Sequence, residues 1–140
     1  MKVSARNVFT GTVTSLTDGG VNAEVEMTMA GGDKLVSRIS ASSVKSMGLA
    51  PGKAVVAIVK APWVTVLVGT CDLQFSTRNQ LKGTISAIMG GALYTEVGIR
   101  LSGGEVVFAM VTNDSARNLA LKEGLAATAL IKASHVILGA

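Results

Sequence analysis

An internal repeat constrains the fold of this chain more than any other feature of its sequence. When the 140 residues are shifted by 72, positions 4–68 meet positions 76–140 without a gap, and 18 of the 65 pairs are identical. About four or five identities are expected by chance at this composition. Two copies of one small fold are therefore expected, with a domain at residues 1–69, a linker at 70–75 and a second domain at 76–140.

Each repeat unit has the pattern of short β-strands interrupted by one helix. Alternating apolar and polar residues between glycine turns predict five strands per unit. They lie at residues 11–16, 21–29, 31–40, 54–60 and 63–69, and again at 83–88, 94–101, 105–112, 127–133 and 135–139. With a helix between the third and fourth strands, this is the element order of a small OB-like barrel. The predicted fold is all-β, with two tandem OB-like five-stranded barrels, each with one short helix.

A short string of residues nearly recurs three times, as SARN at 4–7, STRN at 76–79 and SARN at 115–118. The repeat aligns the first two copies with each other, whereas the third aligns with SVKS. That third copy lies where Asn113 or Asp114 can cap a short helix that ends before Gly124. We therefore expect the third copy to be a helix turn, and the first two to mark equivalent places in the fold.

Composition limits the kinds of partner and compartment. The formal charge of +4 permits an anionic partner. Cys71 is the only cysteine, which precludes an intrachain disulfide and fits a reducing compartment. The longest apolar stretch, 54–69, is interrupted by Lys60 and Pro62, so no membrane span is predicted. Because the N-terminus turns polar too soon for a signal peptide, we expect a cytoplasmic protein.

Motifs for catalysis or for a metal cation are missing from the sequence. It contains no nucleophile elbow, phosphate-binding loop or evident acid–base pair, and no cluster of metal ligands. His135, the only histidine, aligns with Trp63, which favours a packing position over a ligand. We therefore expect neither an enzyme nor a site for a bare metal ion.

Each unit nevertheless keeps a Ser/Arg pair at its start and a lysine near its end. The residues are Ser4, Arg6 and Lys60 in the first unit, and Ser76, Arg78 and Lys132 in the second. These side chains and the peptides between them are donors, and no acceptor-only side chain accompanies them. Such a set suits a small tetrahedral oxyanion. Plain surface charges at strand ends are the alternative, and the duplication of the spacing leaves both interpretations open.

A family resemblance follows from four stretches taken together. They are SARNVFTGTV (4–13), GGVNAEVEM (19–27), VKAPWV (59–64) and IKASHVIL (131–138). Through them the whole chain resembles the molbindins, cytoplasmic proteins made of molybdate-binding Mop (TOBE-type) domains, in their two-domain form. The resemblance implies six OB-like barrels around a threefold axis, hence a homotrimer. It also implies molybdate or tungstate as the bound ligand, no organic cofactor, and a role in molybdenum storage or homeostasis.

The resemblance also implies which residues bind the oxyanion. One set is Ser4, the amide of Ala5 and Arg6, with Lys132, the amide of Ala133 and Ser134 from a neighbouring domain; the other is Ser76, the amide of Thr77, Arg78 and Lys60. A further site near the threefold axis would involve Val21, Asn22 and Ala23. The simplest pairing joins the start of one unit to the end of the other, within a chain or between chains.

Three positions depart from the family pattern. Pro62 stands where the second unit has Ser134 and lacks both a hydroxyl and an N–H, so the set with Pro62 is predicted to bind more weakly. Thr77 replaces an alanine, a change that matters little if only the amide is used. Tyr94 stands where the first unit has Asn22 and puts a bulky ring at the threefold-type position of the second unit.

A nucleic-acid-binding OB-type module is the alternative from another class. Such modules stack bases on aromatic side chains along a basic groove. The few aromatic residues here are scattered and no Lys/Arg run is present, which argues against nucleic acid as a partner. A molybdate-responsive regulator built on the same repeat needs a DNA-binding domain, and none is expected because the first motif begins three residues after Met1.

Overall fold

The computed structural model describes all 140 residues, and its elements follow the expected order in both halves. The first half has β1 (Asn7–Asp18), β2 (Asn22–Met29), β3 (Lys34–Ser40), α1 (Ala41–Ser46), β4 (Ala54–Val59), the 3₁₀ turn η1 (Ala61–Trp63) and β5 (Thr65–Val68). The second has β6 (Asn79–Gly90), β7 (Tyr94–Leu101), β8 (Val106–Thr112), α2 (Asn113–Asn118), β9 (Ala126–Ile131), η2 (Ala133–His135) and β10 (Ile137–Gly139). β1 and β6 start earlier than predicted, directly after the arginine of each SARN-type motif.

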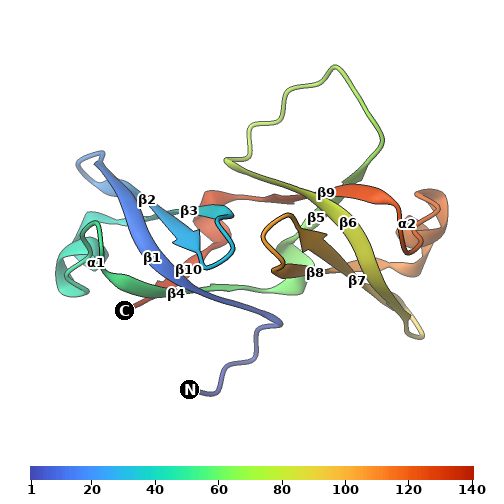
Figure 1. Cartoon of the computed structure of the whole chain (residues 1–140), viewed down its shortest axis with the longest axis horizontal. Coiled ribbons are helices and arrows are strands. Elements are labelled where there is room, and N and C mark those ends of the chain that lie inside the picture. Colours follow the sequence, from blue (N-terminus) through green and yellow to red (C-terminus); the bar gives the residue numbers. More distant parts are fainter.

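The strands form two curled, five-stranded antiparallel sheets that lie side by side (Figure 1). Their strand orders are β10–β4–β1–β2–β3 and β5–β9–β6–β7–β8, here called sheet A and sheet B. β1 and β6 are long and carry an irregularity in register, between Val13 and Ser15 and between Ile85 and Ala87. Such irregularities increase the local twist and help a sheet to curl. The all-β prediction, with one short helix per unit, is confirmed.

Each sheet takes four strands from one half of the chain and its fifth from the other half. β5 pairs with β9 through Thr65 opposite Leu130, and β10 pairs with β4 through Ile137 opposite Ile58. The ranges 1–69 and 76–140 therefore describe the repeat in the sequence, whereas each folded sheet is composite. The chain crosses between sheets at η1 and η2, while the loop around 70–75 connects β5 to β6 within sheet B (Figure 1).

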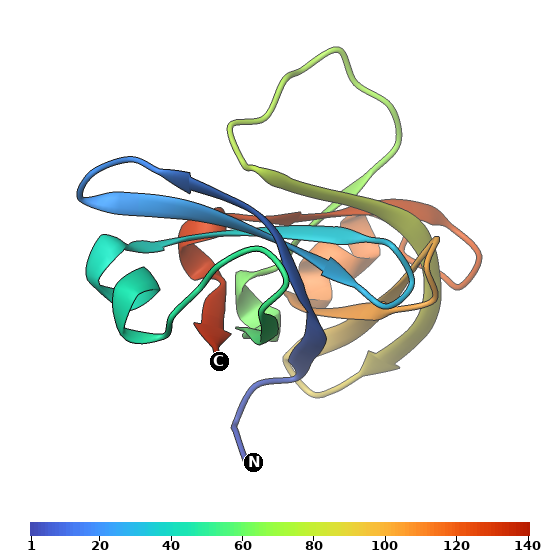
Figure 2. The same ribbon diagram turned by 60° about the vertical axis from the view of Figure 1, so that its left-hand side comes forward.

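Equivalent residues of the two halves meet at the junction between the sheets. The rings of Trp63 and His135 stack with centroids 5.1 Å apart and an interplanar angle of 34°. The β2–β3 turn lies beside the β7–β8 turn (Figure 2), so close that a Cβ on Gly31 would lie 2.1 Å from the carbonyl oxygen of Gly103. Both pairs are 72 residues apart, so an approximate twofold axis relates the two halves and passes through this junction.

Two buried asparagines fasten the start of each unit to the opposite sheet. The side chain of Asn7 donates to the carbonyl of Phe108 at 2.8 Å and accepts from its N–H at 2.7 Å. Asn79 makes the same pair of bonds with Val36, at 2.8 and 2.7 Å. An amide side chain offers one donor and one acceptor side by side, which matches the backbone of an edge strand. The apolar residues around them form one continuous core that extends through both sheets.

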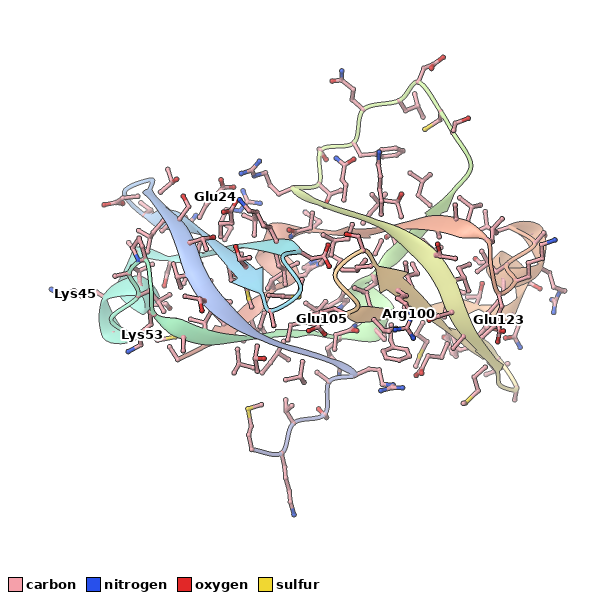
Figure 3. The ribbon with its side chains drawn as sticks, viewed as in Figure 1. Glu24, Lys45, Lys53, Arg100, Glu105 and Glu123 are labelled. Atoms are coloured by element: carbon pink, nitrogen blue, oxygen red, sulfur yellow. The ribbon has the colours of Figure 1, made fainter.

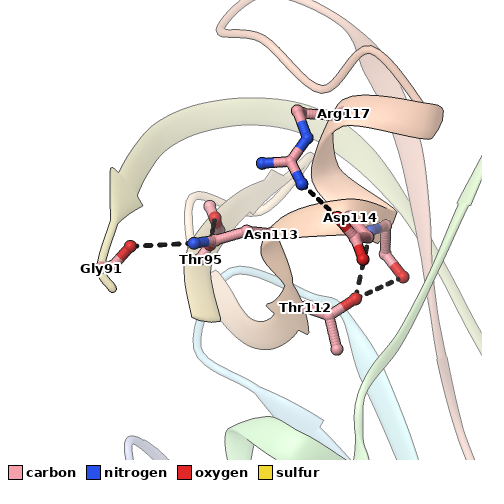
Figure 4. Close-up of polar contacts among 7 residues, drawn as sticks. Gly91, Thr95, Thr112, Asn113, Asp114 and Arg117 are labelled. Atoms are coloured by element: carbon pink, nitrogen blue, oxygen red, sulfur yellow. Dashed lines mark hydrogen bonds and ion pairs between the residues drawn. The ribbon is translucent and has the colours of Figure 1, made fainter. Parts of the chain in front are cut away.

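The two helices have equivalent caps at their N-termini. Ser40 caps α1 by accepting from the N–H of Ser43, and Thr112 caps α2 by accepting from the N–H of Ser115. The predicted cap at Asn113 or Asp114 is thus wrong by one or two residues. Asn113 instead ties α2 to the neighbouring turn, because it donates to the carbonyl of Gly91 (Figure 4). The helices are six residues long, too short to span a membrane.

The third copy of the SARN string lies inside α2, as predicted. Arg117 forms an ion pair with Asp114 on the same helix (Figure 4). The arginine of this copy therefore contacts its own helix and plays no part at the junction between the sheets.

Candidate oxyanion-binding sites

The ends of each unit meet because the first strand and the fourth strand of that unit are paired. In sheet A the last pair of the ladder is Asn7 with Val59, so Arg6 and Lys60 come next on the two strands. In sheet B the last pair is Asn79 with Ile131, so Arg78 and Lys132 come next. We call the group at 4–6 and 60–62 the first site, and the group at 76–78 and 132–134 the second site.

The simplest pairing expected from the sequence therefore does not occur within the chain. It joined Ser4 and Arg6 to Lys132 and Ser134, in the other half. The antiparallel register instead brings each arginine beside the lysine of its own unit. The exchange between sheets begins only after the lysine, at η1 and η2, and so does not separate the two ends.

A glutamate from the opposite half holds each of the two arginines. Arg6 Nε donates to Glu96 Oε1 at 3.1 Å, and the guanidinium lies 3.7 Å from the centre of the Phe108 ring. Arg78 Nε donates to Glu24 Oε2 at 3.2 Å, on the strand where Glu24 is labelled in Figure 3. Both arginine side chains remain more than half exposed, so each ion pair adds little to stability.

These ion pairs orient the guanidinium groups and leave their outer donors free. Glutamate engages only Nε, and neither Nη atom of Arg6 or Arg78 makes a hydrogen bond within the chain. A planar fork of N–H groups held in this way can bind two oxygens of one anion. Sequence reasoning missed Glu24 and Glu96, although they are one of the 18 identical pairs of the repeat.

The remaining groups of both sites are also unpaired donors. Lys60 and Lys132 are exposed, form no ion pair, and precede the 3₁₀ turns. The amides of Ala5, Thr77 and Ala133 donate to no other backbone group, and the hydroxyls of Ser4, Ser76 and Ser134 are exposed without a partner. Because these groups are donors at neutral pH, the arrangement is suited to an anion with several acceptor oxygens.

At the second site, part of this set lines a hollow of about 240 Å³. Ser76, Thr77 and Lys132 contribute to it, together with His135 and the ring of Trp63. Ser134 does not line the hollow and lies exposed on η2. The hollow therefore brings together the start and the end of the second unit at the point where the chain crosses between the sheets.

The turn before β2 forms a separate hollow that contains the predicted threefold-type residues. Val21, Asn22 and Ala23 line it, with Glu24 and Arg38. The equivalent hollow of the second half is lined by Tyr94 and by the ion pair of Asp114 with Arg117 (Figure 4). Each hollow thus has one carboxylate and one guanidinium, Glu24 with Arg38 in the first half and Asp114 with Arg117 in the second, and the two differ in where these groups stand and in the bulk of Tyr94.

The fold and the duplicated motif define the class of this protein. The TOBE domain family matches residues 3–66 and again residues 76–138, so the chain belongs to the TOBE-domain family. No group of three or more His, Cys, Asp or Glu side chains is placed to hold a metal ion.

Among particular relatives, the chain is 42% identical over 138 residues to the molybdenum-pterin-binding protein MopA of Rhodobacter capsulatus, which covers 99% of this chain and 52% of MopA. It is 41% identical over 138 residues to the molybdenum transport protein ModE of Azotobacter vinelandii, covering 99% of this chain and 51% of ModE. The chain thus spans about half the length of the curated relatives it matches.

A solved structure resembles the chain over its full length. The cytoplasmic molybdate-binding protein ModG, in a crystal form with molybdate bound, matches with a TM-score of 0.94 and 50% identity, covering 99% of both chains. These matches confirm the resemblance to two-domain molbindins and the all-β fold of two curled sheets.

Proposed function

We propose that this protein binds molybdate or tungstate at the first and second sites and serves in molybdenum storage or homeostasis in the cytoplasm. The proposed ligands are Ser4, the Ala5 amide, Arg6 and Lys60, and Ser76, the Thr77 amide, Arg78, Lys132, the Ala133 amide and Ser134. Val21, Asn22 and Ala23 are proposed to line a further oxyanion site. The role is one of binding without catalysis and without an organic cofactor.

One observation carries this proposal: an arginine oriented by a glutamate, with both Nη atoms free, lies beside an unpaired lysine in each half of the chain. The donors on one edge of the guanidinium stay available for a tetrahedral dianion, which accepts hydrogen bonds from several directions. The match to molybdate-bound ModG, at 50% identity over 99% of both chains, supports molybdate as that dianion.

Calorimetric titration of the purified protein tests the proposal directly. Molybdate, tungstate, sulfate and phosphate are titrated separately at one ionic strength. We expect saturable binding of molybdate or tungstate, with sulfate and phosphate weaker by at least about tenfold, a difference of about 1.4 kcal/mol. The absence of saturable molybdate and tungstate binding would overturn the proposed function.

We further propose that the chain works as a homotrimer. Each sheet ends in strands that pair with only one neighbouring strand, at β10 and β3 in sheet A and at β5 and β8 in sheet B. Large apolar side chains are also exposed, among them Ile137 on the edge strand β10, Val8 on β1 and Val21 in the turn before β2. Unpaired edges and exposed apolar groups favour association with further copies. Sedimentation equilibrium in the presence of molybdate measures the mass, and a monomer under these conditions would contradict the trimer.

Nucleic acid is not a proposed partner of this chain. One relative, from Escherichia coli, is described as a DNA-binding transcriptional dual regulator, and the chain matches 52% of that protein. The aromatic side chains of this chain are few and scattered, and the sequence has no Lys/Arg run, whereas modules that bind single strands stack bases on aromatic rings along a basic groove. A gel-shift assay at low salt, with and without molybdate, measures this; a shift at micromolar protein would support the alternative function.

A further inference from the structure

Two buried side-chain polar atoms have no hydrogen-bond partner within the protein, one in the second site and the other on the residue that directly follows it. They are Thr77 Oγ1 and His135 Nδ1. Both residues line the hollow of about 240 Å³ at the start of β6. A buried polar atom without a partner costs stability, so such atoms are uncommon unless they face a ligand or bound water.

The chemistry of this hollow selects an anion. Its other polar side chains include the Ser76 hydroxyl and the Lys132 ammonium group, and no carboxylate lines it. A hydroxyl can turn its hydrogen toward an anion, and an imidazole can carry its proton on Nδ1. The residues that carry the two unpartnered atoms therefore line this hollow together with two donors, which is the chemistry that an acceptor-rich ligand requires.

His135 is held in place by its stack on Trp63, at 5.1 Å between ring centroids. The imidazole makes no hydrogen bond within the chain, and Nδ1 is its buried nitrogen. A neutral imidazole carries its proton on one of its two nitrogens, so the tautomer with the proton on Nδ1 makes this buried atom a donor.

We propose that Thr77 Oγ1 and His135 Nδ1 are two further ligand-contacting donors of the second site, and that they make it the tighter of the two oxyanion sites. This inference rests on the proposed function. Family resemblance assigns only the amide of Thr77 to the ligand and assigns nothing to His135. At the first site the equivalent residues are Ala5, which has no hydroxyl, and Trp63, whose only N–H is at a different place on the ring.

The test uses calorimetric titration with molybdate in an Arg6→Ala background, in which the second site dominates. Thr77→Val keeps the shape of the side chain and removes the hydroxyl, whereas Thr77→Ser keeps the hydroxyl. We expect Thr77→Val to weaken binding about two- to tenfold and Thr77→Ser to stay within about twofold of the parent. Thr70→Val, in the exposed linker, is the control and should bind as the parent does.

His135 is tested in the same background. His135→Phe removes the nitrogen and keeps the stack on Trp63, whereas His135→Asn places an amide nitrogen near the position of Nδ1. We expect His135→Phe to weaken molybdate binding about two- to tenfold, and His135→Asn to recover at least half of that loss on a logarithmic scale. Phe and Asn variants of equal affinity would remove His135 from the proposal.

Thermal unfolding without anion separates a ligand role from a structural one. Because Thr77 Oγ1 has no partner in the protein, Thr77→Val should leave the melting temperature unchanged or raise it while affinity falls. Loss of affinity together with a lower melting temperature would overturn the inference, and so would parent-like affinity in Thr77→Val. If the parent itself binds no molybdate, the proposed function fails; if it binds and these variants match it, only this inference fails.

Discussion

Arg6 and Arg78 occupy equivalent places in the two halves of the molecule, but their surroundings differ. Arg6 lies over the ring of Phe108, whereas the residue equivalent to Phe108 in the other half is Val36, so Arg78 has no aromatic partner there. A guanidinium over a ring gains about 0.5–1 kcal/mol when exposed. The first half thus has an aromatic ring beneath the arginine, whereas the second half has more polar groups near it, in Thr77, Ser134 and His135.

The frame that carries the two arginines is the same in both halves. Glu24 and Glu96 hold the arginines, and Asn7 and Asn79 fasten the strands behind them with bonds of nearly equal length. The differences lie in the donors: Ala5 against Thr77, Pro62 against Ser134 and Trp63 against His135. The two halves therefore differ in the donors beside the arginine, while the residues that orient the arginine are the same.

The largest expected effect comes from breaking the shared frame. Asn7→Ala leaves the N–H and carbonyl of the half-buried Phe108 without these partners, and Asn79→Ala does the same to Val36. We expect each variant to lower the free energy of unfolding by about 2–4 kcal/mol, measured by urea denaturation. If the frame is equivalent, the two losses agree within about 1 kcal/mol.

Asn118→Ala is the matched control, because this exposed asparagine ends the third copy of the string and lies in α2. Its loss should stay within about 0.5 kcal/mol. Unequal losses for Asn7 and Asn79, or a loss at Asn118 as large as theirs, would show that the two halves do not share one frame.

The next effect separates the two sites by ligand affinity. Arg6→Ala and Arg78→Ala each remove a charged donor, so each should weaken one class of molybdate sites by about 1.5–3 kcal/mol, or about ten- to a hundredfold. Calorimetric titration of each variant measures which class is lost. Arg6→Ala should retain the tighter class, which we assign to the second site. Arg78→Ala should retain the weaker class, which we assign to the first site. Arg117→Ala should titrate as the parent does, and a loss in that variant would contradict the assignment of the copies.

The sequence predicts the strands and the equivalent motifs of the two halves, but not the exchange of strands between the sheets. The alternation of apolar residues indicated every strand, and the repeat indicated which SARN copies are equivalent. The exchange of β5 and β10 was not predictable from such patterns. Val66 and Leu138 are equivalent and equally buried, at 8% exposure each, so either strand could cover either sheet with the same apolar contacts.

The candidate site was predictable in its donors but not in its arrangement. Residue type alone identified Arg6, Arg78 and the lysines as cations that suit an anion. The pairing of Arg6 with Glu96 requires the start of one unit to reach the opposite sheet, which follows from the exchanged topology. The sequence predicts a packing position for His135, and the contact of its ring with Trp63 agrees with this. That its Nδ1 is buried without a hydrogen-bond partner can be seen only in the structure.

A smaller effect tests the junction that relates the halves. Gly31→Ala places a Cβ within 2.1 Å of the carbonyl oxygen of Gly103, and Gly103→Ala places one within 2.5 Å of the carbonyl oxygen of Gly31. Neither backbone can yield without moving the two sheets apart. We expect each variant to lose about 1–3 kcal/mol of unfolding free energy, measured by urea denaturation. Gly90→Ala meets no atom within 4 Å and should stay within about 0.5 kcal/mol, so equal losses at Gly31 and Gly90 would contradict the contact.

The smallest effect concerns Glu26, whose equivalent in the second half is Gly98. A hydrogen bond from Thr14 Oγ1, 2.9 Å from Glu26 Oε1, and Lys34 Nζ at 3.2 Å hold the pKa of Glu26 below its ordinary value of 4.5. In the second half the Phe108 ring occupies the space where a side chain at position 98 would lie, because a Cβ on Gly98 would be 3.2 Å from that ring. The acidic side chain therefore stabilises only the first half of the chain.

Glu26→Gln should lower the free energy of unfolding by a few tenths of a kcal/mol to about 1 kcal/mol at neutral pH. Because the folded-state pKa is depressed, the parent's advantage is present above pH 4.5 and shrinks as the pH falls through the lower folded-state pKa. Urea denaturation of parent and variant at neutral pH and at about pH 3 measures the difference. Glu123→Gln, at an exposed position labelled in Figure 3, should show no such pH-dependent difference. If the parent's advantage in free energy of unfolding over Glu26→Gln grew on acidification, the ionised carboxylate would destabilise β2. The glycine at position 98 would then cost the second half nothing.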